Sequence, residues 1–129
     1  MDTSHPVPYT SAPRTGETAW LWIFKILTGP LLVILLGVHL IVNHLVTETG
    51  LLTWTDVVLY FNNPWIVLME ITFLATVVTH SLLGIRGIIL DLNPKRKLLK
   101  TLDWALFIFG TVVTLYGLWL ALTISSLSV

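Results

Sequence analysis

Three long apolar stretches dominate the chain and predict three membrane-spanning helices. They run from about residues 20 to 46, 64 to 92 and 102 to 127. Crossing ~30 Å of hydrocarbon with a rise of about 1.5 Å per residue takes ~20 helical residues, and each stretch is longer than that. We therefore expect an all-α integral membrane protein in which residues 19–129 form one three-helix membrane unit.

The residues outside these stretches are more polar. Residues 1–18 contain three prolines and are predicted to form an N-terminal arm in water. Residues 47–63 and 93–100 are interpreted as loops, the second one because Asn93 and Pro94 are typical of the region just after a helix end.

Basic residues predict the orientation of the chain. The segment NPKRKLLK after the second stretch contains Lys95, Arg96, Lys97 and Lys100, whereas residues 47–63 contain no basic residue. By the positive-inside rule, the segment with the basic residues is cytoplasmic. We expect the N-terminus to be cytoplasmic as well, and the C-terminus to lie outside.

Composition supports a membrane location and excludes several classes of function. Only 11% of the residues are charged, against about 25% in an ordinary soluble domain, and the net charge is zero. A nucleic-acid-binding protein would need a basic face. The chain has no cysteine, so it cannot ligate an iron–sulfur cluster or attach a haem through a CxxCH motif. Any redox cofactor must therefore be held non-covalently, through histidine.

Polar residues on the first helix form a single stripe. At about 100° per residue, these side chains fall within about 60° of one another: Lys25, Thr28, His39 and Asn43. His44 points about 140° away from His39, so the two histidines cannot serve one site in the same way. Ionisable groups at membrane depth are costly and usually face the interior of a helix bundle.

The second helix collects polar and small residues on the side of His80. The residues within about 40° of it are Phe73, Thr76, Gly84, Gly87 and Asp91. Glycine one turn and two turns beyond His80 leaves a flat gap beside the imidazole, which is the space that a porphyrin needs. The pattern therefore indicates a haem ligand. The alternative is that His80 hydrogen-bonds another helix and that the glycines are packing points.

Two charged residues of this helix have two interpretations each. Arg86 lies about 120° from His80 and is long enough to reach either a haem propionate or the cytoplasmic surface. Glu70 lies near the outer end and is interpreted as an interfacial residue in water, with a proton-path carboxylate as the alternative.

The third helix presents small residues at helical spacing, namely Gly110, Thr114, Gly117 and Ala121. Such a face allows close packing of helices in a membrane. We interpret this helix as scaffold that carries no redox or proton chemistry.

The run HSLLGIRGIILDL, from His80 to Leu92, resembles the signature of the membrane-anchor (cytochrome b) subunits of succinate dehydrogenase and fumarate reductase, or complex II. These anchors have a haem-ligating histidine in the second helix, then a Gly-x-Arg element, then an aspartate. Gly84, Arg86 and Asp91 stand at the matching positions. The run FKILTGPLLVILLGVHL in the first helix is also similar to this family, as is the pattern of three spans. The likeness covers nearly the whole chain.

The resemblance implies haem b as the cofactor, held together with a second membrane-anchor subunit. His80 would ligate an inner haem iron, and Gly84 and Arg86 would lie at this cofactor. His39 is similar to the extra histidine of anchors with two haems and would ligate the outer iron, with His44 as the alternative. Helix rise separates the levels of His39 and His80 by roughly 10 Å, which favours two separate haems.

The resemblance also implies a quinone substrate, bound near the cytoplasmic surface. Lys25 and Thr28 would hydrogen-bond a quinone oxygen, and Asp91 would relay protons. The alternative for Asp91 is a helix-end residue paired with the basic segment.

In such complexes a flavoprotein subunit oxidises succinate, and an iron–sulfur subunit carries the electrons to the membrane. The chain would dock the iron–sulfur subunit and help to pass electrons to quinone, among the lipids of a prokaryotic plasma (inner) membrane. It would not act on succinate by itself. Two alternatives stay open, namely a cytochrome b subunit of another quinone-linked oxidoreductase and a haem-free scaffold or assembly protein. The direction of the reaction and a higher oligomer of the whole complex stay open as well.

Overall fold

The computed structural model describes residues 18–44 and 53–127, and these residues form α-helices without any strand. The helices are, in chain order, α1 (Ala19–His44), α2 (Trp54–Phe61), α3 (Pro64–Asp91) and α4 (Arg96–Ser125). Helices α1, α3 and α4 have 26, 28 and 30 residues and are apolar enough to cross a membrane. The predicted all-α fold with three membrane-spanning helices is thus confirmed. The predicted arm lies, apart from its last residue, outside the described residues.

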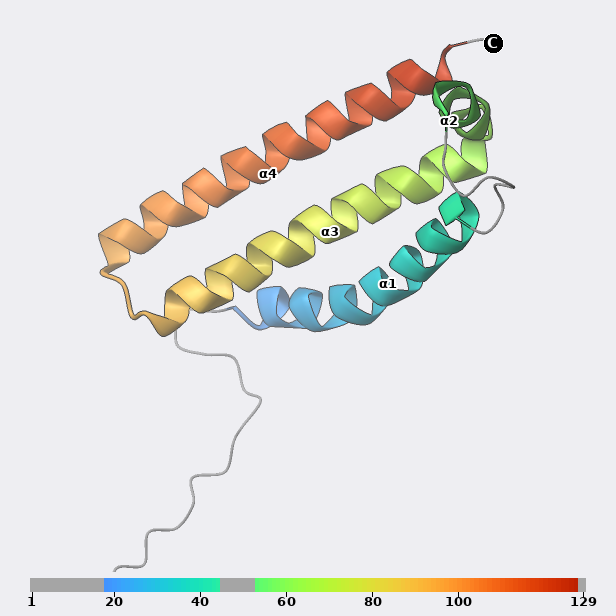
Figure 1. Cartoon of the computed structure of the whole chain (residues 1–129). Helices are drawn as coiled ribbons and strands as arrows, with labels where there is room; N and C mark the ends of the chain where they lie inside the picture. The colour runs from blue at the N-terminus through green and yellow to red at the C-terminus, as the bar shows by residue number, and fades with distance from the viewer. Residues whose placement is uncertain (1–17, 45–52, 128–129) are drawn as a thin grey trace, which may run out of the picture.

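Helix α3 is central in the bundle. It packs against α1 on one side and against α4 on the other, and the backbones of these two outer helices do not approach each other. Figure 1 shows the three long helices side by side, with neighbours antiparallel. The start of α1, the end of α3 and the start of α4 lie together at what we call the basic end, which carries the basic residues 95–100. Helix α2 lies at the opposite end.

The start of α4 differs from the sequence prediction. The helix begins at Arg96 rather than near residue 102, so most of the basic segment that was expected to be a loop forms its first turns. Lysine, arginine and leucine are good helix formers, and hydropathy marks the part of a helix within hydrocarbon rather than its full length. The true connection is short, because Asn93 adopts a left-handed conformation (φ 49°) that ends α3 before Pro94.

The predicted loop 47–63 is also wrong in part, because it contains α2. A capping box between Thr53 and Asp56 starts this helix. The Asp56 carboxylate accepts hydrogen bonds from the backbone N–H (2.8 Å) and the hydroxyl (2.7 Å) of Thr53, and the Asp56 N–H donates to the Thr53 hydroxyl oxygen (3.3 Å). Val58 is 1% exposed and fixes the inner face of α2 on the bundle. The Thr-x-x-Asp spacing is the signal that predicts such a helix.

Replacing Asp56 with asparagine is expected to destabilise α2 and to remove the loss of α2 stability at acidic pH. Hydrogen bonds from the Thr53 side chain, and then from its backbone, lower the pKa of Asp56 below the usual 3.8. A carboxyl whose pKa is lowered by folding stabilises the fold above its unfolded pKa, and this contribution is lost as the pH falls through the folded pKa. Hydrogen-exchange protection of the α2 amides should therefore hold from neutral pH to about pH 4 and then fall. In the Asp56→Asn variant, protection of α2 should be lower at neutral pH and should not fall further below about pH 4. An equal fall in this variant would show that Asp56 does not cause the acid sensitivity of α2.

Small residues bring α4 close to α3. A Cβ added to Gly110 would collide with a methyl group of Leu82, and a Cβ added to Gly117 would collide with a methyl group of Leu74. Gly110 and Ala121 are buried. The small-residue face that the sequence predicts on the third helix is therefore confirmed as its contact with α3.

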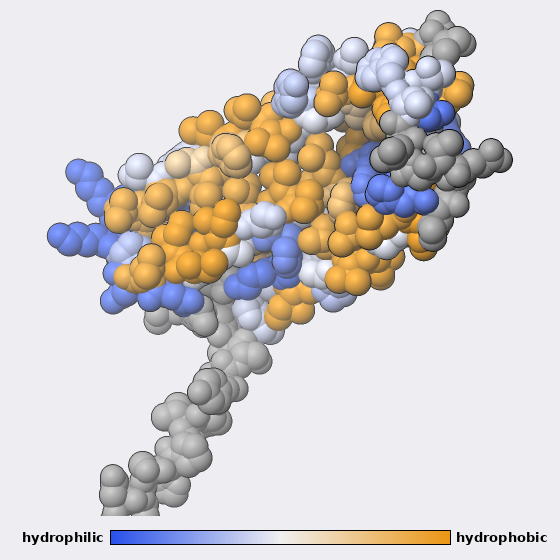
Figure 2. Space-filling view, in the orientation of Figure 1, coloured by the Kyte–Doolittle hydropathy of each residue, from blue (hydrophilic) through white to orange (hydrophobic). Residues whose placement is uncertain are grey.

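Most large apolar side chains point away from the bundle. Among the described residues, Val58 and Ala121 are the buried hydrophobic ones. Figure 2 shows apolar side chains over most of the visible surface, with hydrophilic side chains near the two ends and one hydrophilic group between them. Trp20 and Trp65, each the second residue of its helix, are 72% and 77% exposed, as expected of residues at a membrane interface, and Trp104, about two turns into α4, is 66% exposed. The broad faces of the bundle are thus suited to contact lipid or other subunits.

Candidate functional site

Two polar clusters lie in the contact between α1 and α3. The inner cluster, nearer the basic end, consists of Lys25, Thr28, His80 and Gly87. The outer cluster consists of His39, Asn43, Tyr60, Glu70 and Phe73. The stripe predicted on the first helix and the polar face predicted on the second helix therefore face each other, as their helical spacing indicates.

A hydrogen bond between Thr28 and His80 organises the inner cluster. Thr28 Oγ1 lies 3.0 Å from His80 Nδ1 and donates its own hydrogen to the carbonyl oxygen of Phe24 (2.7 Å). Because the hydroxyl hydrogen is used in this way, the hydroxyl oxygen accepts from His80, and Nδ1 carries the imidazole hydrogen. The neutral ring then has its lone pair on Nε2, which is the nitrogen available to a metal. Thr28 is only 9% exposed, so this hydrogen bond is shielded.

Glycine residues leave room around the His80 ring. A Cβ at Gly29 of α1 would lie 3.5 Å from His80 Cε1, in ordinary contact with the ring. One turn beyond His80 on α3, a Cβ at Gly84 would meet no atom of the described residues within 4 Å. The position one turn beyond His80 is therefore open among the described residues.

The three residues expected to contact a quinone have different surroundings in the structure. Lys25 reaches from α1 toward α3, where its Nζ lies 3.7 Å from the Cβ position of Gly87. Asp91 is the last residue of α3 and is exposed at the basic end. Thr28 differs from both, because its hydroxyl is bound to His80.

His39 and Glu70 form the centre of the outer cluster. His39 Nδ1 lies 2.9 and 3.0 Å from the two carboxylate oxygens of Glu70. Since a carboxylate only accepts, Nδ1 carries the hydrogen and Nε2 again has the lone pair. The imidazole also stacks on Phe73, with 4.9 Å between ring centroids. The Glu70 side chain is only 15% exposed, so the expectation of an interfacial residue in water is wrong.

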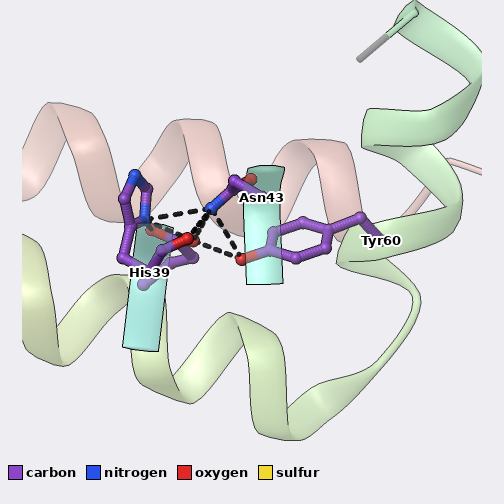
Figure 3. A network of polar contacts seen from close by, with 4 residues as sticks. His39, Asn43 and Tyr60 are labelled. Atoms are coloured by element: carbon purple, nitrogen blue, oxygen red, sulfur yellow. Dashed lines mark hydrogen bonds and ion pairs between the residues drawn. The ribbon is translucent and has the colours of Figure 1, made fainter. Parts of the chain in front are cut away.

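Asn43 and Tyr60 complete the outer cluster, where they converge on the same carboxylate (Figure 3). The Tyr60 hydroxyl donates to Glu70 Oε1 (2.5 Å), and Asn43 Nδ2 lies 3.4 Å from that oxygen and 3.3 Å from the Tyr60 oxygen. Burial, and secondly the hydrogen bond to Glu70, raise the pKa of Tyr60 above its usual 10, so the hydroxyl stays a donor. Tyr60 was not identified from the sequence, because a loop was predicted at this residue, and the direction of a side chain cannot be predicted in a loop.

The two histidines lie at different levels of the bundle. His80 is bound to Thr28, and His39 follows Thr28 by eleven residues on α1, which corresponds to ~16 Å along the helix. The sequence estimate of roughly 10 Å was smaller because it measured each histidine from the assumed end of its own helix. At such a separation the two imidazoles serve separate sites.

The opposite side of α3 carries an ion pair with α4. Arg86 Nε and Nη2 lie 2.7 and 3.2 Å from the two carboxylate oxygens of Asp103, in the two-pronged arrangement typical of arginine. The pair lines one part of an apolar cavity of about 600 Å³ between α3 and α4. This ion pair does not contradict the interpretation of the third helix as scaffold, but the pattern of small residues did not reveal which of its side chains faces Arg86.

The remaining candidate, His44, is the exposed last residue of α1. Residues 18–44 and 53–127 contain no group of three or more histidine, aspartate or glutamate side chains arranged to hold a metal ion. What these residues offer are two single imidazoles, each oriented through Nδ1 by the neighbouring helix.

Comparison with known proteins shows the family to which the chain is related. Residues 8–119 match the family model of the succinate dehydrogenase/fumarate reductase transmembrane subunit. The chain belongs to this family. It is also 28% identical over 102 residues to the succinate dehydrogenase hydrophobic membrane anchor subunit of Thermoplasma acidophilum, in a match that covers 79% of this chain and 83% of that protein.

The chain is thus a multi-pass membrane anchor of succinate dehydrogenase/fumarate reductase, and other subunits of the complex are implied. The family match includes α1, α2, α3 and most of α4. Both polar clusters therefore lie in the part of the anchor that the family model describes.

Proposed function

We propose that this anchor binds haem b through His80 at an inner site and through His39 at an outer site, each shared with a second membrane-anchor subunit. One observation carries the proposal: each Nδ1 is bound by the neighbouring helix, and within the described residues neither Nε2 has a hydrogen-bond partner. Histidines that ligate metals donate their other ring N–H in this way.

The space around the two rings fits this assignment. At the inner site, Gly84 leaves an open gap beside His80 and Gly29 lets the ring lie against α1. At the outer site, the His39 side chain is 30% exposed although Glu70 and Phe73 hold it, so one edge of the ring is accessible to a partner subunit.

When bound, haem b supplies a one-electron carrier whose potential depends on its axial ligands and surroundings. His80 and His39 hold the iron, while Thr28 and Glu70 orient the two rings. The ~16 Å between the two levels suits two sites in succession across the membrane. Contact between Arg86 and a haem propionate stays a prediction, and the Asp103 carboxylate holds the guanidinium on the α4 side of α3.

We further propose that Lys25 and Asp91 contribute to a quinone site at the basic end. The Lys25 ammonium group donates a hydrogen bond to a quinone oxygen, and the Asp91 carboxylate holds a proton for the reduced product. Thr28 is the exception among the three predicted contacts, because its hydroxyl oxygen accepts from His80. An ion pair of Asp91 with the basic residues remains the alternative.

The basic end is also the proposed docking surface for the iron–sulfur subunit, which receives electrons from the flavoprotein that oxidises succinate. By the positive-inside rule we expect this end to face the cytoplasm, and we propose that the membrane is a prokaryotic plasma membrane. Residues 95–100 supply four of the seven basic residues of the chain, so this end is where a negatively charged partner surface is attracted most strongly.

Optical spectra of the assembled complex test the haem assignment. We expect reduced-minus-oxidised spectra to show that His80→Ala and His39→Ala each remove one haem b, whereas His44→Ala retains both. Flavin content of the membranes shows that each variant complex assembles. Wild-type spectra without haem b would contradict the proposal, and loss of a haem in His44→Ala with retention in His39→Ala would transfer the outer site to His44.

A further inference from the structure

The Glu70 carboxylate is shared between His39 and two other donors. His39 Nδ1 lies 2.9 Å from Oε1 and 3.0 Å from Oε2. Tyr60 donates to the same Oε1 from α2, and Asn43 Nδ2 approaches it at 3.4 Å. The hydrogen bonds of Tyr60 and Asn43 therefore compete with that of His39 for the negative charge of one side chain.

We propose that Glu70 is a positioning residue for His39, and that Tyr60 limits how strongly its carboxylate acts on the imidazole. Glu70 and Tyr60 then shift the potential of the outer haem in opposite directions. This inference rests on the proposed function of His39 as an axial ligand.

The direction of each shift follows from electrostatics. A carboxylate that accepts the Nδ1 hydrogen makes the imidazole more basic and a stronger donor to a metal at Nε2. A negative charge next to the ring also favours the oxidised state of the iron, which is the more positive one. Glu70 therefore lowers the potential of the outer site.

Tyr60 works against this effect. The strong hydrogen bond from Tyr60 to Glu70 Oε1 draws negative charge away from the contact with His39. Any donor that shares a carboxylate with another donor has this effect. The hydroxyl lies on α2, which is outside the three membrane-spanning helices and is held on the bundle by Val58. The short helix α2 thus places a hydrogen-bond donor at the outer cluster.

Redox titration of the whole complex, followed through the haem absorbance, tests this inference. At a fixed ambient potential, Glu70→Gln should raise the reduced-to-oxidised ratio of the outer haem about tenfold, which equals about 59 mV for a one-electron couple. Tyr60→Phe should lower the same ratio several-fold. Tyr116→Phe is the matched control, because Tyr116 is 61% exposed on α4, and it should leave both haems unchanged.

The inner haem serves as an internal reference, since its level lies ~16 Å away along α1. It should titrate alike in all of these variants. A role of Glu70 and Tyr60 in structure alone would weaken haem binding in both variants but would not shift the potential up in one and down in the other.

The results separate this inference from the function on which it rests. If His39→Ala loses the outer haem but Tyr60→Phe leaves its potential unchanged or raises it, the inference is wrong and the ligand assignment stands. If Glu70→Gln loses the outer haem altogether, the inference is tested by Tyr60→Phe alone. A lower potential of the outer haem in this variant supports the inference, and an unchanged or higher potential overturns it. If His39→Ala retains both haems, the outer ligand assignment is wrong, and the inference is overturned with it.

Discussion

Replacing Asp103 with leucine is expected to destabilise the assembled anchor by about 2 kcal/mol, because it removes the carboxylate that balances the charge of Arg86. Breaking a fully buried ion pair costs about 3–5 kcal/mol, whereas an exposed pair contributes about 0–1 kcal/mol. The side chains of Arg86 and Asp103 are 15% and 37% exposed, which places this pair between the two cases. The midpoint of thermal unfolding of the complex in detergent measures the loss.

A double variant shows whether charge balance is the cause. Arg86→Leu combined with Asp103→Leu should recover most of the stability, because leucine at both positions suits the apolar cavity between α3 and α4. Lys100→Leu is the control, since it removes an exposed charge from the same helix, one turn away. Equal losses in Asp103→Leu and in the double variant would show that packing, not charge, explains the effect.

Replacing Gly117 with valine is expected to force α3 and α4 apart and to cost about 2 kcal/mol. A Cβ at this position would collide with Leu74, and the two methyl groups of valine extend the clash. In a membrane, such close approach of helices at small residues replaces the hydrophobic driving force that operates in water. The yield of assembled complex and its thermal midpoint should both fall.

Shortening the opposing side chain should repair this defect. Leu74→Ala removes the atoms with which the new Cβ collides, so the pair Gly117→Val and Leu74→Ala should be more stable than Gly117→Val alone. Gly37→Val is the control, because a Cβ at Gly37 of α1 meets nothing within 4 Å in the described residues. If Gly37→Val is equally harmful, the effect belongs to valine in a helix and not to the contact with α3.

Helical periodicity predicted the directions of side chains well. The long, regular spans gave the positions of Thr28 and His39 on one face of α1, and of His80 on the facing side of α3, because each angle depends only on the number of residues between them. The structure confirms that these faces meet.

Helical periodicity could not predict which side chains pair with each other across a contact between two helices. Periodicity gives the direction of Arg86 but not the level of the neighbouring helix, so the pairing with Asp103 and that of His39 with Glu70 came only from the structure. Levels were estimated from apolar boundaries, and these differ from helix ends, as the start of α4 at Arg96 shows. For Tyr60 a signal existed, since the capping box at Thr53 marks the helix that carries it.

The single row of helices has a consequence for how the protein is made in the cell. Because α3 lies between α1 and α4, and these two outer helices do not pack against each other, the polar contact between α1 and α3 is not enclosed by the third long helix. In a newly inserted chain that has not met the other subunits, the partly exposed polar groups of this contact, such as the His39 side chain (30% exposed), face lipid, and exposed polar groups in a membrane are costly. The lifetime of the orphan chain should therefore be short, and co-synthesis with the other subunits should decide how much anchor accumulates.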